Sequence, residues 1–276
     1  MLVNGKRSQE LELSDRGFNF GDGHFTTIKV IAGEPLLLTL HIARLKHACG
    51  ILAIDFEHWD ELEATIEYQA SIKQQGILKA TITRGSGGSG YGTVGCSAAN
   101  WYLQFRPIPS HYQEWREAGV ELTICAYQQT VTPHFAGLKT LNRLDQVMIK
   151  QELDKRNAND GLVCSTDGFV IETSMANLFW VKNNVVYTPS IHRSGVDGVM
   201  RTHIIELLKS INIRVKEADY SITEIYSAQE VFISNAVMEL VPISRIAADD
   251  IAVAVDYDYF HHVGSITAIV QALLSR

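Results

Sequence analysis

The stretch Phe135-Ala136-Gly137-Leu138-Lys139-Thr140-Leu141-Asn142-Arg143 places a lysine between a glycine and the expected start of an amphipathic helix. A lysine amine becomes a useful nucleophile near neutral pH only when its pKa falls from about 10.4 towards roughly 7 to 8, and apolar neighbours or a helix N-terminus lower it. Phe135, Leu138 and Leu141 could supply such neighbours. We therefore expect Lys139 to form a Schiff base. Taken alone, the stretch also fits an exposed lysine near a helix start.

The composition is that of a globular protein with room for two domains. The chain has 276 residues, of which 46% are hydrophobic and 20% are charged. Its formal net charge is −7, and its lysines and arginines form no run longer than two residues. A nucleic-acid binder usually gathers basic residues into runs that neutralise phosphates. The sequence therefore argues against a nucleic-acid partner, while a small anionic substrate would need only a few arginines.

The N-terminus and the cysteines indicate a cytoplasmic protein without structural disulfides. The chain becomes polar after Val3, and we expect neither a signal peptide nor a membrane span. Its four cysteines lie far apart and form no C-x-x-C pair. There is no H-E-x-x-H motif, and the adjacent pair His261-His262 would diverge on a helix, so we expect no metal site.

The first part of the chain predicts a small domain of strands and helices. Asn4-Gly5 suits a tight type I′ hairpin, and residues 25–38 read as a second hairpin. Thr39 is expected to cap a helix that ends near Gly50, and Gly76 is expected to cap a helix over residues 60–75. Strands are expected over 77–84 and 101–105.

The loop Gly85-Ser86-Gly87-Gly88-Ser89-Gly90-Tyr91-Gly92 formally matches the G-x-G-x-x-G pattern. A dinucleotide-binding fingerprint must open a helix, but strand-like residues follow here. We expect instead a mobile loop that carries Tyr91 into a site.

Pro107-Ile108-Pro109-Ser110 predicts a domain boundary, because prolines two apart disfavour both helix and central strand. The expected division is 1–106, a linker over 107–118, and 119–276. In the last part, a helix over 141–157 is expected to turn Leu144, Val147, Met148, Ile149 and Leu153 to the core. An antiparallel meander is expected over 162–188, then a helix over 199–210, further strands and a closing helix over 257–274.

Several residues outside the lysine loop could take part in catalysis or binding. Glu172 ends a strand, where a carboxylate could hold the pyridine nitrogen of pyridoxal phosphate, although it could also cap a turn. The stretch from Gly195 to Arg201 opens onto a helix whose N-terminus could bind phosphate. Arg44 could add a cation, and Asn235-Ala236 could add backbone N–H groups. Each feature alone also has an ordinary structural reading.

These motifs together resemble the fold-type IV pyridoxal phosphate enzymes. The resemblance spans Ser14 to Arg201 and rests on motifs that keep their order and spacing. They are Ser14-Asp15-Arg16-Gly17, Phe20-Gly21-Asp22-Gly23, His41-x-x-Arg44-Leu45, the lysine loop, Glu172-x-x-x-x-Asn177 and Gly195-Val196-x-Gly198-x-x-Arg201. The family includes branched-chain and D-amino acid aminotransferases and 4-amino-4-deoxychorismate lyase. The loop that ends in Tyr91 and the run Lys139-x-Leu141-Asn142-Arg143-Leu144 look closest to the lyase branch.

The resemblance implies an α+β fold with a smaller N-terminal sheet-and-helix domain and a larger C-terminal domain that has a barrel-like antiparallel sheet. It implies a homodimer that binds pyridoxal 5′-phosphate and a small anionic substrate. Lys139 would hold the cofactor and Glu172 would contact its ring nitrogen. The other cofactor contacts would be Arg44, Asn177, Val199, Met200, Asn235 and Ala236, and the candidate substrate contacts are Thr26, Thr27, Arg84 and Tyr91.

The expected activity is a lyase that forms 4-aminobenzoate and pyruvate in folate biosynthesis. One alternative is an aminotransferase acting on D- or branched-chain amino acids, which would share the whole cofactor site. Leu144 argues against the branched-chain branch, because the enzymes of that branch resemble one another in having a tyrosine at this position. A second alternative, from another class, is a non-catalytic protein that binds pyridoxal phosphate.

Overall fold

The computed structural model describes residues 1–247, 255–256 and 265–275, and its chain divides into two compact units. Unit 1 contains Met1–Pro109 and the short segment Leu138–Asn142, and unit 2 contains Ser110–Gly137 and Arg143–Arg276. The change of unit after Pro109 falls inside the expected linker. The lysine segment, expected in the second domain, is grouped with unit 1 instead.

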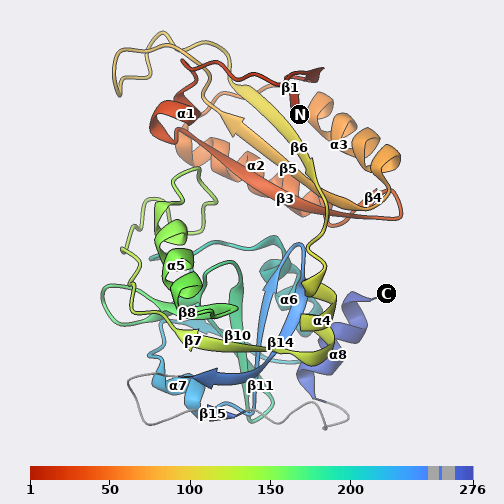
Figure 1. The fold of residues 1–276 in the computed structure, drawn as a ribbon, viewed down its shortest axis with the longest axis vertical. Coiled ribbons are helices and arrows are strands. Elements are labelled where there is room, and N and C mark those ends of the chain that lie inside the picture. The colour runs from red at the N-terminus through yellow and green to blue at the C-terminus, as the bar shows by residue number, and fades with distance from the viewer. Residues whose placement is uncertain (248–254, 257–264, 276) are drawn as a thin grey trace. The chain divides into compact units, whose positions relative to one another are not determined.

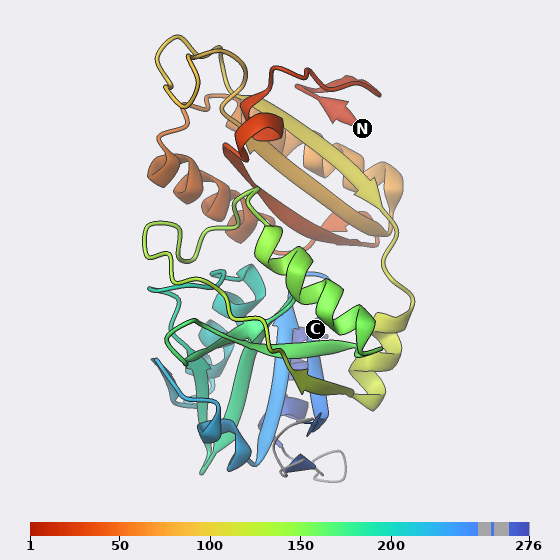
Figure 2. The same cartoon turned by 60° about the vertical axis from the view of Figure 1, so that its left-hand side comes forward.

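Unit 1 is a six-stranded sheet in the order β2-β1-β6-β5-β3-β4 with two long helices packed on one face (Figures 1 and 2). Its core joins Ile28, Leu78 and Ile82 of the sheet to Leu45 and Leu62 of the helices, and all five side chains are buried. The elements are β1 (Leu2–Val3), β2 (Lys6–Arg7), α1 (Arg16–Phe20), β3 (Gly23–Ile31), β4 (Glu34–Pro35), α2 (Leu38–Leu52), α3 (Trp59–Lys73), β5 (Gly76–Thr83) and β6 (Asn100–Arg106).

The local predictions for unit 1 are mostly confirmed, but two helix caps were wrong. Asn4 and Gly5 both have positive φ, as the predicted hairpin requires. Helix α2 begins at Leu38 after Leu37 in a left-handed conformation, so Thr39 lies inside its first turn. Gly76 opens β5 and does not cap α3. A Cβ at this glycine would lie 2.2 Å from the Phe105 ring, so close packing explains the glycine.

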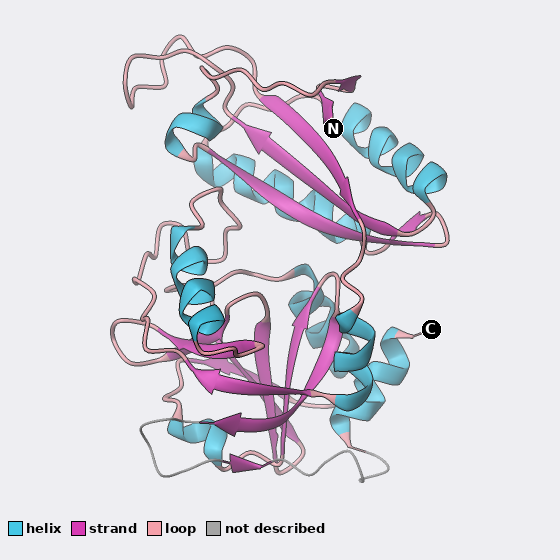
Figure 3. Ribbon diagram, in the orientation of Figure 1, coloured by secondary structure: helices cyan, strands magenta, loops and turns pink. Residues whose placement is uncertain are grey.

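Unit 2 is built on a nine-stranded sheet that curls into a half barrel (Figure 3). The strand order is β12-β11-β10-β13-β14-β7-β8-β9, with β15 paired to β14. The elements are α4 (His111–Ala118), β7 (Val120–Ile124), α5 (Leu144–Lys155), β8 (Asp160–Cys164), β9 (Val170–Thr173), β10 (Asn177–Lys182), β11 (Val185–Pro189), α6 (Val199–Ser210), β12 (Val215–Ala218), α7 (Thr223–Tyr226), β13 (Glu230–Asn235), β14 (Glu239–Ala247), β15 (Val255–Asp256) and α8 (Ile266–Leu274).

The expected meander over 162–188 was wrong in its connectivity, although its four strands exist. β8 pairs with β9 and β10 pairs with β11, both antiparallel, but the two pairs lie apart in the strand order. β7 pairs in parallel with both β8 and β14, and β11 pairs in parallel with β12, so the sheet is mixed. Turn residues mark where a strand ends but do not choose its partner.

Helix α6 has the predicted bounds, but α5 begins at Leu144 and not at Leu141. Residues 141–143 are not helical: the Leu141 N–H donates to the Gly23 carbonyl, and Thr140, just before them, bridges to His24 of β3. Ile149 and Leu153 are buried as predicted, whereas Leu144 is 73% exposed and Val147 and Met148 are also exposed. The start of the expected closing helix and the pair His261-His262 lie outside the described residues. No helix in the described ranges combines the length and apolar character needed to cross a membrane.

Candidate active site

Lys139 is positioned in unit 1 by its backbone, which runs beside the first residues of β3. The Phe25 N–H donates to the Lys139 carbonyl at 2.9 Å, and the Leu141 N–H donates to the Gly23 carbonyl at 3.0 Å. The Lys139 Nζ lies 5.1 Å from the centre of the Phe25 ring. The sheet edge therefore fixes where the amine emerges, and the aromatic face gives it an apolar surface on one side.

Arg44 is held against β3 by Thr26, whose side chain is fully buried. The Arg44 guanidinium donates to the Thr26 hydroxyl, and the His41 Nδ1 lies 2.6 Å from the same oxygen. Burial and the nearby Arg44 charge keep the pKa of His41 well below its usual range, and they lower the pKa of His24 to about 4. Both imidazoles are therefore neutral near pH 7, so Arg44 supplies the positive charge of this cluster.

A second arginine of unit 1, Arg16, fixes the glycine loop. Its side chain is buried, its Nε donates to Asp22 at 2.8 Å, and its other two nitrogens donate to backbone carbonyls of Gly87, Gly90, Tyr91 and Gly92. No helix follows this loop; the next named element is β6. Arg16 thus holds this loop by hydrogen bonds. Because no helix follows the loop, the G-x-G-x-x-G match is not a dinucleotide fingerprint, as predicted.

Arg84 serves a structural contact in unit 1. Its Nε donates to Asp22 at 2.8 Å, and its terminal nitrogens donate to the carbonyls of Ala53 and Leu52 at the end of α2. Each guanidinium nitrogen already donates within the unit. This geometry does not support the expected contact between Arg84 and a substrate carboxylate.

Tyr91 and Thr27 are the remaining substrate candidates of unit 1. Tyr91 is 87% exposed, and its ring meets that of Phe20 edge-on with centroids 5.4 Å apart. Thr27 is partly exposed and lies on the same side of β3 as Phe25, since alternate residues of a strand share a face. Phe20 is followed by Gly21, where a Cβ would lie 2.8 Å from the Asn142 side chain. Through α1, the Tyr91 loop is therefore linked to the Lys139 segment.

Glu172 is the central acid of unit 2. It is 6% exposed, and its Oε2 accepts from the Val196 N–H at 3.1 Å and, at a longer 3.4 Å, from the Asn177 amide. The Asn177 amide also donates to the Val196 carbonyl at 2.8 Å. Glu172 and Asn177 lie on neighbouring chain segments, and both hold the loop that leads into α6.

The N-terminus of α6 contains Val199 and Met200, the two residues expected at a phosphate. The preceding residue, Gly198, is the N-cap, and no side chain caps the helix. A Cβ at Gly198 would lie 2.0 Å from the Asn177 Oδ1, so only glycine fits there. Arg201 instead donates to Glu217 at 2.7 Å and to the Pro189 carbonyl at 3.1 Å. Arg201 is thus engaged within the unit, and the backbone N–H groups at the start of α6 are the groups that could bind an anion.

Asn235 and Ala236 follow β13 in unit 2. The Asn235 Oδ1 accepts from the N–H groups of Val237 and Met238, both at 2.9 Å, which shapes the turn after the strand. Ser234, directly before it, is fully buried, and its hydroxyl has no hydrogen-bond partner among the described residues. A buried polar atom of this kind usually marks an unseen partner.

Arg143 belongs to the lysine motif, but the sequence did not indicate a role for it. Burial lowers the pKa of Arg143, while the carboxylates of Glu172 and Asp145 act in the opposite direction. The Glu172 charge therefore has a nearby cation in its own unit. His24, His41 and Arg16 were also missed as network members, since only their contacts distinguish them from ordinary buried or surface residues.

The expected site residues therefore fall into two groups, one in each unit. Unit 1 contains Lys139, Arg44 and the glycine loop with Tyr91. Unit 2 contains Glu172 and the N-terminus of α6. Pyridoxal phosphate needs an amine, an acidic partner for its ring nitrogen and donors for its phosphate. The buried Glu172, the glycine forced at position 198 and the orphaned Ser234 hydroxyl fit such a group.

Comparisons with known proteins identify relatives of this chain. The sequence profile of the family described as Amino-transferase class IV matches residues 23–246. An aminodeoxychorismate lyase of Vibrio harveyi is 36% identical over 251 residues, which cover 90% of this chain and 92% of that protein.

Solved structures extend the likeness to the fold. A 4-amino-4-deoxychorismate lyase from Pseudomonas aeruginosa superposes with a TM-score of 0.90 at 32% identity and covers 99% of this chain and 97% of its own. A branched-chain amino acid aminotransferase of Escherichia coli has a TM-score of 0.85 at 21% identity, with 99% and 92% coverage. The second likeness concerns the fold alone.

Proposed function

The chain belongs to the class IV aminotransferase family, and from that premise we propose that it is a pyridoxal phosphate-dependent lyase that converts 4-amino-4-deoxychorismate into 4-aminobenzoate and pyruvate. The observation that carries the proposal is the likeness to two such lyases over at least nine tenths of the chain. The buried Glu172 and the backbone-fixed Lys139 support it chemically.

The cofactor, when bound, supplies an electron sink conjugated to the substrate amine. Lys139 would hold it and, once its amine is free, remove the proton from C4 of the substrate. Loss of this proton and departure of enolpyruvate leave an aromatic ring. Return of a proton to the enolpyruvate carbon gives pyruvate, so atoms balance and no oxidant is needed. We assign that return to Lys139 as well.

Glu172 would keep the proton on the cofactor's ring nitrogen. A carboxylate that accepts hydrogen bonds from the Val196 N–H and the Asn177 amide remains a good acceptor in a buried place. Asn177 then acts on the same loop and keeps the start of α6 in position.

The phosphate would be held by Arg44 and by the N–H groups of Val199 and Met200. The turn at Asn235 and Ala236 would add further backbone donors. Thr26 would act through Arg44 by fixing its guanidinium. For the substrate we retain Thr27 and Tyr91 as candidate contacts, and Thr26 becomes a positioning residue.

An aminotransferase remains the second candidate, since the family is described by that activity. It would share every residue discussed above and differ in substrate contacts. Branched-chain enzymes resemble one another in having a tyrosine where this chain has Leu144. The Leu144 side chain is 73% exposed at the start of α5. A non-catalytic cofactor-binding protein would leave the Lys139 and Glu172 arrangement without a purpose.

The deciding experiment supplies 4-amino-4-deoxychorismate to the purified holoenzyme without any keto acid. We expect steady release of 4-aminobenzoate and pyruvate in equal amounts, and no release from Lys139→Ala. Reduction with borohydride should attach the cofactor to Lys139 and to no other lysine. Conversion of the cofactor to its amine form by D-alanine or leucine, with the chorismate derivative untouched, would instead establish the aminotransferase.

We further propose that the enzyme is a homodimer in the cytoplasm. The resemblance supports the dimer. Sedimentation at micromolar concentration tests it directly: a monomer with full activity would refute it.

A further inference from the structure

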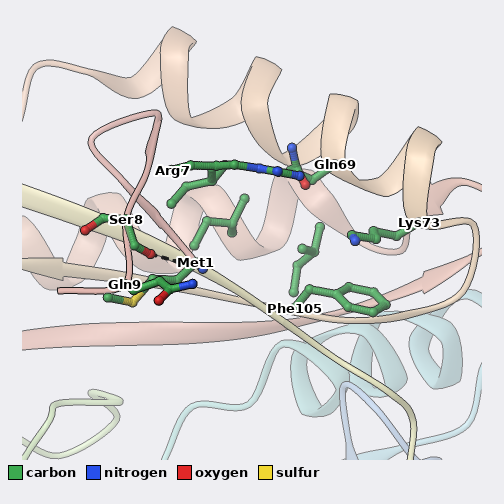
Figure 4. Close-up of a pocket in the computed structure, with 10 residues that line it drawn as sticks. Met1, Arg7, Ser8, Gln9, Gln69, Lys73 and Phe105 are labelled. Atoms are coloured by element: carbon green, nitrogen blue, oxygen red, sulfur yellow. Dashed lines mark hydrogen bonds between the residues drawn. The ribbon is translucent and has the colours of Figure 1, made fainter.

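A cavity opens on unit 1, on the face of the sheet opposite to Lys139. It lies between the N-terminal hairpin, helix α3 and strands β5 and β6 (Figure 4). Leu78 lines it, and the next residue, Lys79, lies over the Phe25 ring. Neighbouring residues of a strand point to opposite faces. Because the Lys139 amine also lies over Phe25, the cavity belongs to a site separate from the candidate active site.

The cavity has the size and lining of a small-molecule site. Its volume is about 520 Å³, within the usual range of roughly 300 to 1,000 Å³. Leu78 and Leu103 form an apolar floor, and Phe105, which is 37% exposed, forms a wall. Figure 4 shows Arg7 and Gln69 on one side of the opening and Lys73 near Phe105.

The charge of the lining has one sign. Arg7 and Lys73 both line the cavity, and no aspartate or glutamate does. Among the described residues, neither cation forms an ion pair with a carboxylate. Most other arginines of the described ranges do so, namely Arg16, Arg84, Arg116, Arg156, Arg193, Arg201 and Arg245. In a chain of net charge −7, two such cations at one cavity favour an anion.

The aromatic wall orders one of these cations. The Lys73 Nζ lies 5.1 Å from the centre of the Phe105 ring, which holds the ammonium at the cavity. A planar carboxylate suits the fork of an arginine, and an aromatic body suits a wall of phenylalanine and leucine. We propose that this cavity binds a small aromatic carboxylate, with the carboxylate at Arg7 and Lys73 and the ring against Phe105 and Leu103.

The test uses benzoate as the probe and benzamide as its uncharged counterpart. Binding is followed by ligand-observed NMR on the whole protein, so the readout does not depend on activity. We expect benzoate to bind and benzamide to bind at least about tenfold more weakly. Arg7→Gln and Lys73→Gln should each weaken benzoate binding roughly three- to tenfold, because each removes one charge-assisted hydrogen bond at an exposed, solvent-screened site.

Lys46→Gln is the matched control. Lys46 is also an exposed lysine over an aromatic ring, 5.4 Å from the centre of Trp59, but it does not line the cavity. Its substitution should leave benzoate affinity unchanged. Equal binding of benzamide, or benzoate binding that survives the double variant of Arg7 and Lys73, would overturn the proposal. Thermal unfolding of each variant confirms that the comparison is made between folded proteins.

Discussion

At the scale of single residues, the main finding is that Lys139 and Glu172 are each fixed by backbone groups. Lys139 is set by two ladder bonds to β3, and Glu172 accepts the N–H of Val196. The hydrogen bonds at Lys139 are made by the backbone and do not depend on its side chain, and Glu172→Gln keeps a side-chain oxygen that can accept from the Val196 N–H. Substitutions at these positions should therefore report on chemistry more than on folding.

For Glu172→Gln we expect retention of the cofactor and a loss of turnover. The neutral amide no longer favours a protonated ring nitrogen, and contributions of this type are worth roughly 10²- to 10⁴-fold. The measurement is the rate of pyruvate release with cofactor content determined in parallel. Glu224→Gln, on exposed α7, is the control. Wild-type turnover in Glu172→Gln would remove this residue from the site.

For Arg44→Ala we expect weaker cofactor binding with a smaller effect on the chemical step. A charged hydrogen bond contributes about 1.5 to 3 kcal/mol, or roughly 10- to 150-fold in affinity. Thr26→Val should give part of the same loss, because it removes the hydroxyl that fixes the guanidinium.

The dissociation constant of pyridoxal phosphate, measured by titration of the apoprotein, checks both variants. Arg214→Ala, on an exposed side chain, should behave as wild type. A dissociation constant unchanged by Arg44→Ala would place this arginine away from the phosphate.

At the scale of elements, hydrogen bonds from Arg16 hold the glycine loop over residues 85–92. One buried guanidinium reaches Asp22 and the carbonyls of Gly87, Gly90, Tyr91 and Gly92. A loop rich in glycine has much conformational entropy to lose, so it stays in one shape only when such bonds hold it. The position of Tyr91 thus depends on a residue far away in sequence.

We expect Arg16→Gln to loosen this loop while the rest of unit 1 stays folded. Chymotrypsin should then cleave after Tyr91 at least about tenfold faster, since several bonds worth roughly 1 kcal/mol or more each are lost. Mass spectrometry of the first fragments gives the cleavage site and its rate. Arg106→Gln is an exposed control. Unchanged cleavage at Tyr91 would show that the loop holds its shape without the arginine.

The sequence predicted elements well where their signals were local. Helix α6 was found with the observed bounds because the glycine-bearing loop from Gly195 to Gly198 marks its start. Helix α5 was placed too early, because Leu141 fits a helical pattern but its N–H donates to the Gly23 carbonyl of β3. The hydrophobic pattern of a segment cannot show that it will form hydrogen bonds with a strand distant in sequence.

For the candidate site, too, sequence motifs indicated some residues, whereas the roles of others became clear only from their contacts. Motif spacing singled out Lys139, Glu172, Asn177 and the start of α6, and the structure brings Glu172, Asn177 and the loop before α6 together in unit 2. Motif spacing gave Arg84 a substrate role that its contacts do not support. It also gave no role to His41, since a buried neutral histidine is recognised only from what surrounds it.

At the scale of the whole molecule, the buried histidines of unit 1 tie stability to pH. Burial and Arg44 lower the pKa of His24 to about 4 in the folded protein, while an unfolded histidine titrates near about 6.5. Between these values the unfolded chain binds more protons than the folded one. The free energy of unfolding therefore falls as the pH drops from about 6.5 towards 4.

We expect this decline to reach about 1.4 kcal/mol per pH unit for each such histidine. His24→Gln should flatten it by that amount, whereas the exposed His47→Gln should not. Denaturant unfolding at several pH values measures the slope. Parallel curves for wild type and His24→Gln would mean that His24 is protonated in the folded state.

The path of the chain between the two units has a further consequence for how such a protein can change during evolution. The chain leaves unit 1 after Pro109, returns for Leu138–Asn142 and leaves again. Lys139 is therefore encoded among the residues of unit 2 but fitted to a strand of unit 1. A recombination event that exchanged everything after Pro109 would bring in a foreign lysine segment and set it against a resident β3. The foreign segment would have to reproduce the backbone hydrogen bonds to Gly23 and Phe25, so we expect recombination at this boundary to preserve the site only between genes whose β3 and lysine segments match.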